Sequence, residues 1–138
     1  MYIMAAKVMS PERLAEQFVV VEKALRSRRL NRFDGVMVSA ETNEQIVKSH
    51  SGELKNIIQG LFKNKMKKDA CEHCGASGVV LERAHTRAGP EIALEALNEI
   101  HPDPRVPIAL REFMSAFLRK HMEVGIWLLC KKCHKTLG

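Results

Sequence analysis

Four cysteines stand in two pairs with the Cys-x-x-Cys spacing, and their chemistry is that of a metal site. The sequence reads ACEHCG at residues 70–75 and LLCKKCHKTLG at residues 128–138. These segments contain every cysteine of the chain: Cys71, Cys74, Cys130 and Cys133. Zinc prefers four soft ligands in a tetrahedron, and two turns of this spacing supply four thiolates. Because a closed four-thiolate site leaves no open coordination position, we expect a structural zinc that stabilises the fold and takes no part in chemistry.

Two histidines stand close to this cysteine pattern. His134 follows the last cysteine directly, and His85 ends the segment LERAH at residues 81–85. A neutral imidazole can take a proton from water near pH 7, and it can also bind a divalent ion. The spacing therefore raises the question of a second, reactive site beside the zinc.

Two short strands and a helix are expected to position these residues. The segment GVVLERAHT, residues 78–86, alternates as a strand does. One face would carry Val79, Leu81 and Arg83, and the other Val80, Glu82 and Ala84. GIWLLC at 125–130 reads as a second strand, and KKCHKTL at 131–137 should begin a last helix that carries the final histidine.

This order of a cysteine knuckle, a strand ending in histidine and a strand running into LLCKKCH resembles the zinc-containing HNH endonucleases. These are ββα-metal nucleases that cleave DNA with one divalent ion per active site. The resemblance covers residues 71–138. It implies that His85 is the general base that activates the attacking water and that His134 binds a catalytic Mg²⁺ or Mn²⁺ ion. A different assignment, with His85 as a metal ligand, is also open.

Two positions depart from the family pattern. Ala84 stands where the family usually has a metal-binding Asp or His, and Gly125 stands where it usually has an Asn. Glu82, His101 and His121 are candidates to complete the metal site. Glu82 shares its strand face with Ala84, and His121 precedes the second strand closely, so these two are preferred.

Basic residues near these segments are candidates for contacts with the DNA backbone. They are Arg83, Arg87, Lys67, Lys68, Lys131 and Lys132. Arginine forks match phosphate geometry, and lysines that neutralise phosphates release counterions. The net charge of +6 agrees with a polyanionic partner, and the aromatic content of 5% argues against base stacking as the main binding mode. The alternative is ordinary solvated surface charge.

Residues 1–69 are expected to form a helical region that supplies dimer or DNA contacts. A first helix should start at Ser10-Pro11, and a second, starting at Thr42 or Ser51, should end near Met66. The apolar stripe expected on the first helix consists of Leu14, Phe18, Val21 and Leu25. Residues 70–138 would form the nuclease core, with a helical insertion in two pieces between its strands.

The sequence thus predicts an α+β fold that is mainly helical and contains a ββα-metal, treble-clef-like zinc core. The predicted function is a metal-dependent DNA endonuclease of restriction type, or of a phage, virus or mobile element. It would cut double-stranded DNA and act as a homodimer. The alternatives are a zinc-stabilised nucleic-acid-binding module without catalysis and a zinc-stapled interaction protein. The sequence has no apolar run of the roughly 18 residues that span a bilayer and no signal-peptide segment, so a cytoplasmic location is expected.

Overall fold

The structure is a computed structural model of the 138-residue chain, and it describes residues 9–64, 66, 68–85 and 88–137. The side chains of residues 62–64, 85 and 137 lie outside this description. The fold is α+β and mainly helical, as the sequence predicts. Its elements in chain order are α1 (Pro11–Leu25), the 3-10 helix η1 (Arg28–Phe33), β1 (Met37–Val38), α2 (Asn43–Ser49), α3 (Ser51–Asn64), β2 (Leu81–His85), α4 (Gly89–Ile100), β3 (Ile108–Ala109), α5 (Leu110–Lys120), β4 (Ile126–Cys130) and α6 (Lys131–Leu137).

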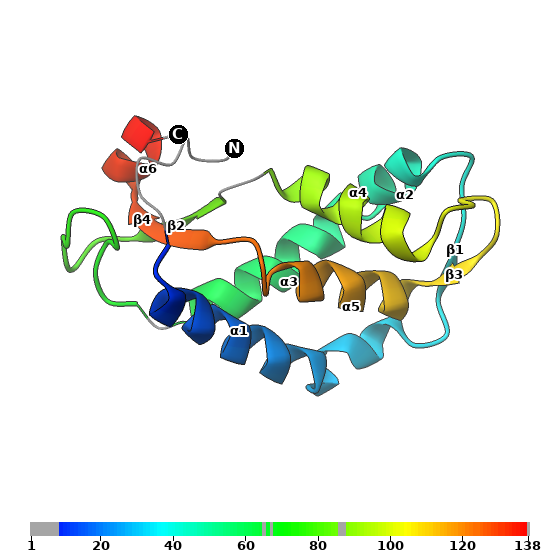
Figure 1. Ribbon diagram of the computed structural model, residues 1–138, viewed down its shortest axis with the longest axis horizontal. Coiled ribbons are helices and arrows are strands. Elements are labelled where there is room, and N and C mark those ends of the chain that lie inside the picture. The colour runs from blue at the N-terminus through cyan, green and yellow to red at the C-terminus, as the bar shows by residue number, and fades with distance from the viewer. Residues whose placement is uncertain (1–8, 65, 67, 86–87, 138) are drawn as a thin grey trace.

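The helices form the body of the molecule, and the two small sheets lie at its opposite ends (Figure 1). One apolar core connects the helices and includes Val21 of α1, Ile58 of α3, Ile92 of α4 and Phe113 of α5. Residues on both sides of position 70 therefore share this core, and the division into 1–69 and 70–138 stays a prediction from the sequence. None of the helices in the described part of the chain has both the length and the apolar character that crossing a bilayer requires.

The first helix starts as predicted but buries a different face. Ser10 caps it, since its Oγ accepts a hydrogen bond from the backbone N–H of Arg13 at 3.1 Å. The predicted stripe is wrong at Phe18, whose side chain is 43% exposed. The buried positions are Arg13, Gln17, Val21 and Ala24. Polar side chains occupy two of them because residues far along the chain offer them hydrogen-bonding partners.

The second predicted helix is two helices. Thr42 caps α2 with a capping box that includes Gln45, and α3 begins at Ser51, so both starts considered in the sequence are helix starts. Similarly, the second piece of the predicted helical insertion, PIALREFMSAFLRKH at residues 107–121, begins as strand β3, and α5 starts only at Leu110. The pairing of β3 with β1 explains this difference, because Met37 faces Ala109 across the antiparallel ladder.

Strands β2 and β4 form the sheet that carries the candidate site. They pair antiparallel, with Leu81 opposite Cys130, Ala84 opposite Trp127 and His85 opposite Ile126. Helix α6 follows β4 without a connecting residue. Its side chains therefore start beside the end of β4, and both α6 and α3 contact β2.

Candidate functional site

The four cysteines come together at one end of the β2–β4 sheet. Their sulfur atoms all lie within 4.8 Å of one another, and Cys74 Sγ is 3.8 Å from Cys130 Sγ. Zinc–sulfur bonds of about 2.3 Å at tetrahedral angles place the sulfurs roughly 3.8 Å apart. The donor set and its spacing therefore fit a zinc ion, and the cluster could hold one.

The knuckle turns direct backbone N–H groups at these sulfurs. The N–H of His73 donates to Cys71 Sγ at 3.4 Å, and the N–H of Cys133 donates to Cys130 Sγ at 3.5 Å. Gly75 closes the first turn with a φ of 76°, in the left-handed region that favours glycine. Such bonds stabilise thiolates, which are the form that binds a metal ion.

The pKa values of two of the thiols are shifted in opposite directions. Burial raises the pKa of Cys133 to about 12, and hydrogen bonds with the other three cysteines also raise it. Burial raises the pKa of Cys71 as well, but hydrogen bonds from backbone N–H groups outweigh it and lower the pKa to about 6. Four thiols in one cluster resist ionising together, and a divalent cation removes that penalty.

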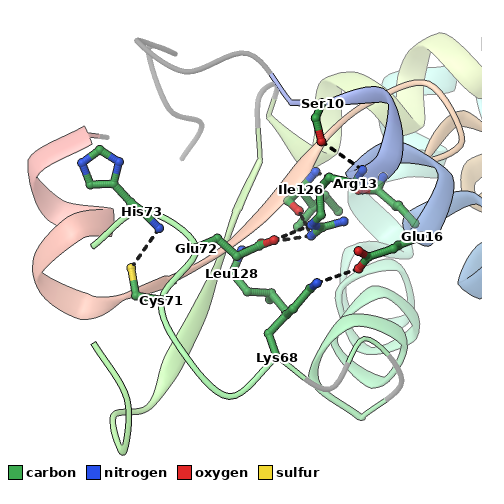
Figure 2. Close-up of polar contacts among 10 residues, drawn as sticks. Ser10, Arg13, Glu16, Lys68, Cys71, Glu72, His73, Ile126 and Leu128 are labelled. Atoms are coloured by element: carbon green, nitrogen blue, oxygen red, sulfur yellow. Dashed lines mark hydrogen bonds and ion pairs between the residues drawn. The ribbon is translucent and has the colours of Figure 1, made fainter. Parts of the chain in front are cut away.

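A buried ion pair ties α1 to this cluster, as Figure 2 shows. Arg13 donates from Nε and Nη2 to the two carboxylate oxygens of Glu72, and Nη2 also donates to the carbonyl oxygen of Ile126 at 2.8 Å. The N–H of Leu128 donates to Glu72 Oε2 at 2.7 Å. The Arg13 and Glu72 side chains are only 7% and 10% exposed. Helix α1, the first knuckle and β4 are thus joined at one point.

Gln17 makes a second connection one turn further along α1. Its Nε2 donates to the carbonyl oxygens of His121 and Val124, and its Oε1 accepts from the N–H of Ile126 at 3.1 Å. The sequence alone did not single out Arg13, Gln17 and Glu72. A signal was available for the first two, because residues 13 and 17 precede Val21 at helical spacing on one face.

His134 lies on α6 beside β2, where its Nδ1 is 2.8 Å from Glu82 Oε1. An ionised carboxylate only accepts hydrogen bonds, so Nδ1 carries a proton, and in the neutral ring Nε2 then has an available lone pair. The Nε2 atom is buried and has no hydrogen-bonding partner among the described residues. This geometry suits a metal ligand whose ring is oriented by a carboxylate.

A cavity of about 380 Å³ adjoins His134. Its apolar floor consists of Val47, Leu54, Ile58 and Phe117. Its polar rim consists of Ser51, Lys55, Arg83 and His134. The first residues of α4, Gly89 and Pro90, complete the described lining. Segments from both halves of the sequence therefore form the cavity.

Arg83 of the polar rim is a half-buried cation. Burial lowers the pKa of its guanidinium group, because removal from water disfavours the charged form. No hydrogen bond or ion pair joins the guanidinium group of Arg83 to another described residue. A guanidinium group that is partly buried and has no such partner can bind an anion through its N–H groups.

The two other histidine candidates lie in different surroundings. His121 is fully buried, its Nδ1 is 2.8 Å from the carbonyl oxygen of Phe117, and burial lowers its pKa to about 4. His101 follows the last residue of α4, and the 12 residues of that helix put it about 18 Å from the cavity end. Among the described residues, the four cysteines are the only group of three or more side chains placed to hold a metal ion. Glu82, His121 and His134 do not form such a group.

The remaining predicted site residues are distributed around these features. The backbone of His85 ends β2, but its side chain lies outside the described part of the structure, as do Arg87 and Lys67. Lys68 Nζ is 2.6 Å from Glu16 Oε2, in an ion pair with α1. Lys131 and Lys132 are exposed on the first turn of α6.

Comparison with protein-family models, with curated proteins and with solved structures finds no match for the chain. What the structure itself establishes is an α+β protein with a four-cysteine cluster that could hold a metal ion such as zinc.

Proposed function

We propose that the protein is a metal-dependent endonuclease that hydrolyses phosphodiester bonds in double-stranded DNA. In this proposal β2, β4 and α6 form a ββα-metal, treble-clef-like unit with a structural zinc at the four cysteines. The observation that carries it is the state of His134. Glu82 holds its Nδ1, and its buried Nε2 lacks a hydrogen-bonding partner among the described residues, beside a cavity rimmed by cationic groups.

The roles follow from the chemistry of these side chains. His134 would hold the catalytic Mg²⁺ or Mn²⁺ ion through Nε2, and Glu82 would fix the ring rather than bind the ion. The ion would supply charge stabilisation at the scissile phosphate. His85, at the end of β2, would take the proton from the attacking water. Arg83 would hold a phosphate oxygen through its guanidinium fork.

The donor set makes Mn²⁺ the better ion of the two. Mg²⁺ prefers oxygen ligands, whereas imidazole binds the later transition metals more readily. Among the described residues the site offers one imidazole with an available lone pair and no second carboxylate placed with it. We therefore expect faster cleavage with Mn²⁺, with water and phosphate oxygens as the other ligands.

The basic residues extend the proposed DNA contact beyond the cut. Lys131 and Lys132 on α6 are exposed and adjacent to the unit that carries His134. One site cuts one strand, so a double-strand break would require a homodimer. The exposed side chains of Phe18 and Val19 on α1 would be available for such a contact.

The second candidate function is a zinc-stabilised nucleic-acid-binding module without catalysis. One observation favours it. Ala84, at the position where HNH nucleases carry a metal-binding Asp or His, is fully buried and packs with Trp127 and the cysteine cluster. The strand face therefore supplies no replacement ligand at that position.

Plasmid nicking distinguishes the two functions. The zinc-loaded full chain is incubated with supercoiled plasmid and Mn²⁺ or Mg²⁺, and nicked product is followed with time. We expect the wild type to nick, and His85→Ala and His134→Ala each to slow nicking by about 10²–10⁴-fold. His73→Ala is the matched control, because His73 is exposed on the first knuckle and only its backbone N–H is used. If the wild type nicks with neither ion, the nuclease proposal fails and the binding module remains.

A further inference from the structure

The cavity beside His134 has two chemically different parts. Its apolar floor is deep, since Val47, Leu54, Ile58 and Phe117 are 6%, 5%, 1% and 2% exposed. These side chains come from α2, α3 and α5. A phosphate or a sugar–phosphate backbone alone would leave such a floor in contact with water. We therefore expect the part of the ligand that contacts the floor to be apolar.

The charges of the polar rim favour an anionic group in the ligand. Lys55 and Arg83 carry positive charge, and no described residue that lines the cavity carries a carboxylate. Arg83 is half-buried without a partner among the described residues, so an anionic ligand would supply the interaction that its surroundings lack. The buried Nε2 of His134 adds one more group without a partner among them.

The volume of about 380 Å³ lies in the range of roughly 300–1,000 Å³ that is usual for small-molecule sites. A ligand that joins one anionic group to a ring with apolar faces would meet both parts. We propose that the cavity binds a single nucleotide, with the phosphate at the polar rim and the base over the apolar floor. In DNA this would be a nucleotide turned out of the helical stack next to the cut. This inference rests on the proposed function, which brings a DNA strand to His134.

The first test measures binding of free ligands to the zinc-loaded full chain by calorimetry. The ligands are a deoxynucleoside 5′-monophosphate, the matching deoxynucleoside and inorganic phosphate. We expect the monophosphate to bind roughly tenfold or more tightly than either part alone, because only it uses both floor and rim. Equal affinity for monophosphate and inorganic phosphate, or no binding of monophosphate, would overturn the proposal.

Two variants locate the binding in the cavity. Arg83→Gln should weaken monophosphate binding about tenfold and leave nucleoside binding unchanged. Arg105→Gln is its control, because Arg105 is an exposed arginine of the loop between α4 and β3. Ser51→Phe places a ring at the rim from an exposed position and should abolish binding of both ligands. Ser51→Phe also tests the location of the site if Arg83→Gln fails to fold. Binding that survives Ser51→Phe in a folded, zinc-loaded protein would place the ligand elsewhere.

The second test distinguishes a nucleotide in DNA from a free nucleotide. A duplex with a fluorescent adenine analogue, whose emission rises on unstacking, is mixed with the protein and Ca²⁺. An increase in emission that is seen with the wild type and is absent with Ser51→Phe supports the turned-out nucleotide. Monophosphate binding without a rise supports the nucleotide site with free nucleotide as its source. If the plasmid is never nicked but Arg83-dependent binding occurs, the nuclease proposal fails and the nucleotide site stands. If the plasmid is nicked but the monophosphate does not bind and the emission does not rise, the nuclease proposal stands and the nucleotide site is overturned.

Discussion

The cysteine cluster and the region around His134 share β2, β4 and α6, but most of the polar groups at the cluster bond to other parts of the chain, whereas the groups around His134 face a cavity. At the cluster, backbone N–H groups donate to the sulfurs, and Arg13 and Glu72 bond each other and the backbone of β4. Of the Arg13 side chain, only Nη1 is buried without a hydrogen-bonding partner among the described residues. Around His134, a buried ring nitrogen and a half-buried arginine lack partners among the described residues beside a cavity.

In the proposed function, this difference assigns a structural role to the cysteine cluster and a ligand-binding role to the region around His134. Buried polar groups in native proteins are nearly always hydrogen-bonded, and the exceptions gather at functional sites. The cysteine side matches a structural role, in which these bonds join α1, the first knuckle and β4. The histidine side would keep open positions because a ligand fills them. Substitutions can change each of the two regions separately.

Removing one thiolate should have the largest effect, because structural zinc contributes roughly 10–16 kcal/mol in small zinc domains, comparable to the whole stability of a domain. We expect Cys130→Ser to lose the bound zinc and with it the cooperative fold. Atomic spectroscopy gives the zinc per chain, and circular dichroism gives the helix content.

His73→Ala, on the other knuckle of the same cluster, is the control, and it should keep one zinc and the wild-type spectrum. Full zinc content and an unchanged melting temperature in Cys130→Ser would show that the cluster is not what holds the fold together.

Breaking the buried ion pair should have the next largest effect. Arg13→Met leaves the Glu72 carboxylate buried without its cation, which typically costs about 3–5 kcal/mol of unfolding free energy. Urea unfolding of the zinc-loaded protein measures this cost. Adding Glu72→Gln should restore part of it, because the amide is uncharged and can still accept from the N–H of Leu128.

The exposed pair provides the comparison. Glu16 is about half exposed in its pair with Lys68, so Glu16→Gln should cost less than about 1 kcal/mol. A loss for Arg13→Met no larger than for Glu16→Gln would mean that the buried connection to α1 does not stabilise the cluster.

Acid should lower the stability of the whole fold through His121. Burial holds its folded pKa at about 4, below the ordinary 6.5. The unfolded chain therefore takes up a proton that the folded chain does not, and stability present above about pH 6.5 is lost as the pH falls toward 4. At about 1.4 kcal/mol per pH unit, the loss by pH 5 is about 2 kcal/mol.

Urea unfolding at about pH 7.5 and pH 5 measures this loss. His121→Asn, whose amide nitrogen can replace Nδ1 at the Phe117 carbonyl, is the control, because acid release of zinc acts equally on both proteins. Equal losses in the two proteins would assign the acid sensitivity to the cysteines instead.

Local patterns allowed the cysteine side and the order of strand, strand and helix to be predicted. The cysteine pairs, the alternation of LERAH and the stretch before Cys130 are readable because each depends on neighbouring residues. The connection to α1 was not readable, since Arg13 finds its acceptor 113 residues away at Ile126. Nor was the cavity, because its lining combines five helices and a strand. The contact of Glu82 Oε1 with His134 Nδ1 was not readable either, and it is the reason why the proposal gives Glu82 the role of orienting His134.

Stepwise chelation tests the central claim that one unit carries a structural and a catalytic metal site. A chelator is added to the active protein in increasing amounts, and zinc per chain and the nicking rate are measured on the same samples. We expect nicking to disappear while one zinc per chain remains, and Mn²⁺ to restore it. Nicking that declines only in step with zinc loss, and that Mn²⁺ does not restore, would contradict the separation of the two sites.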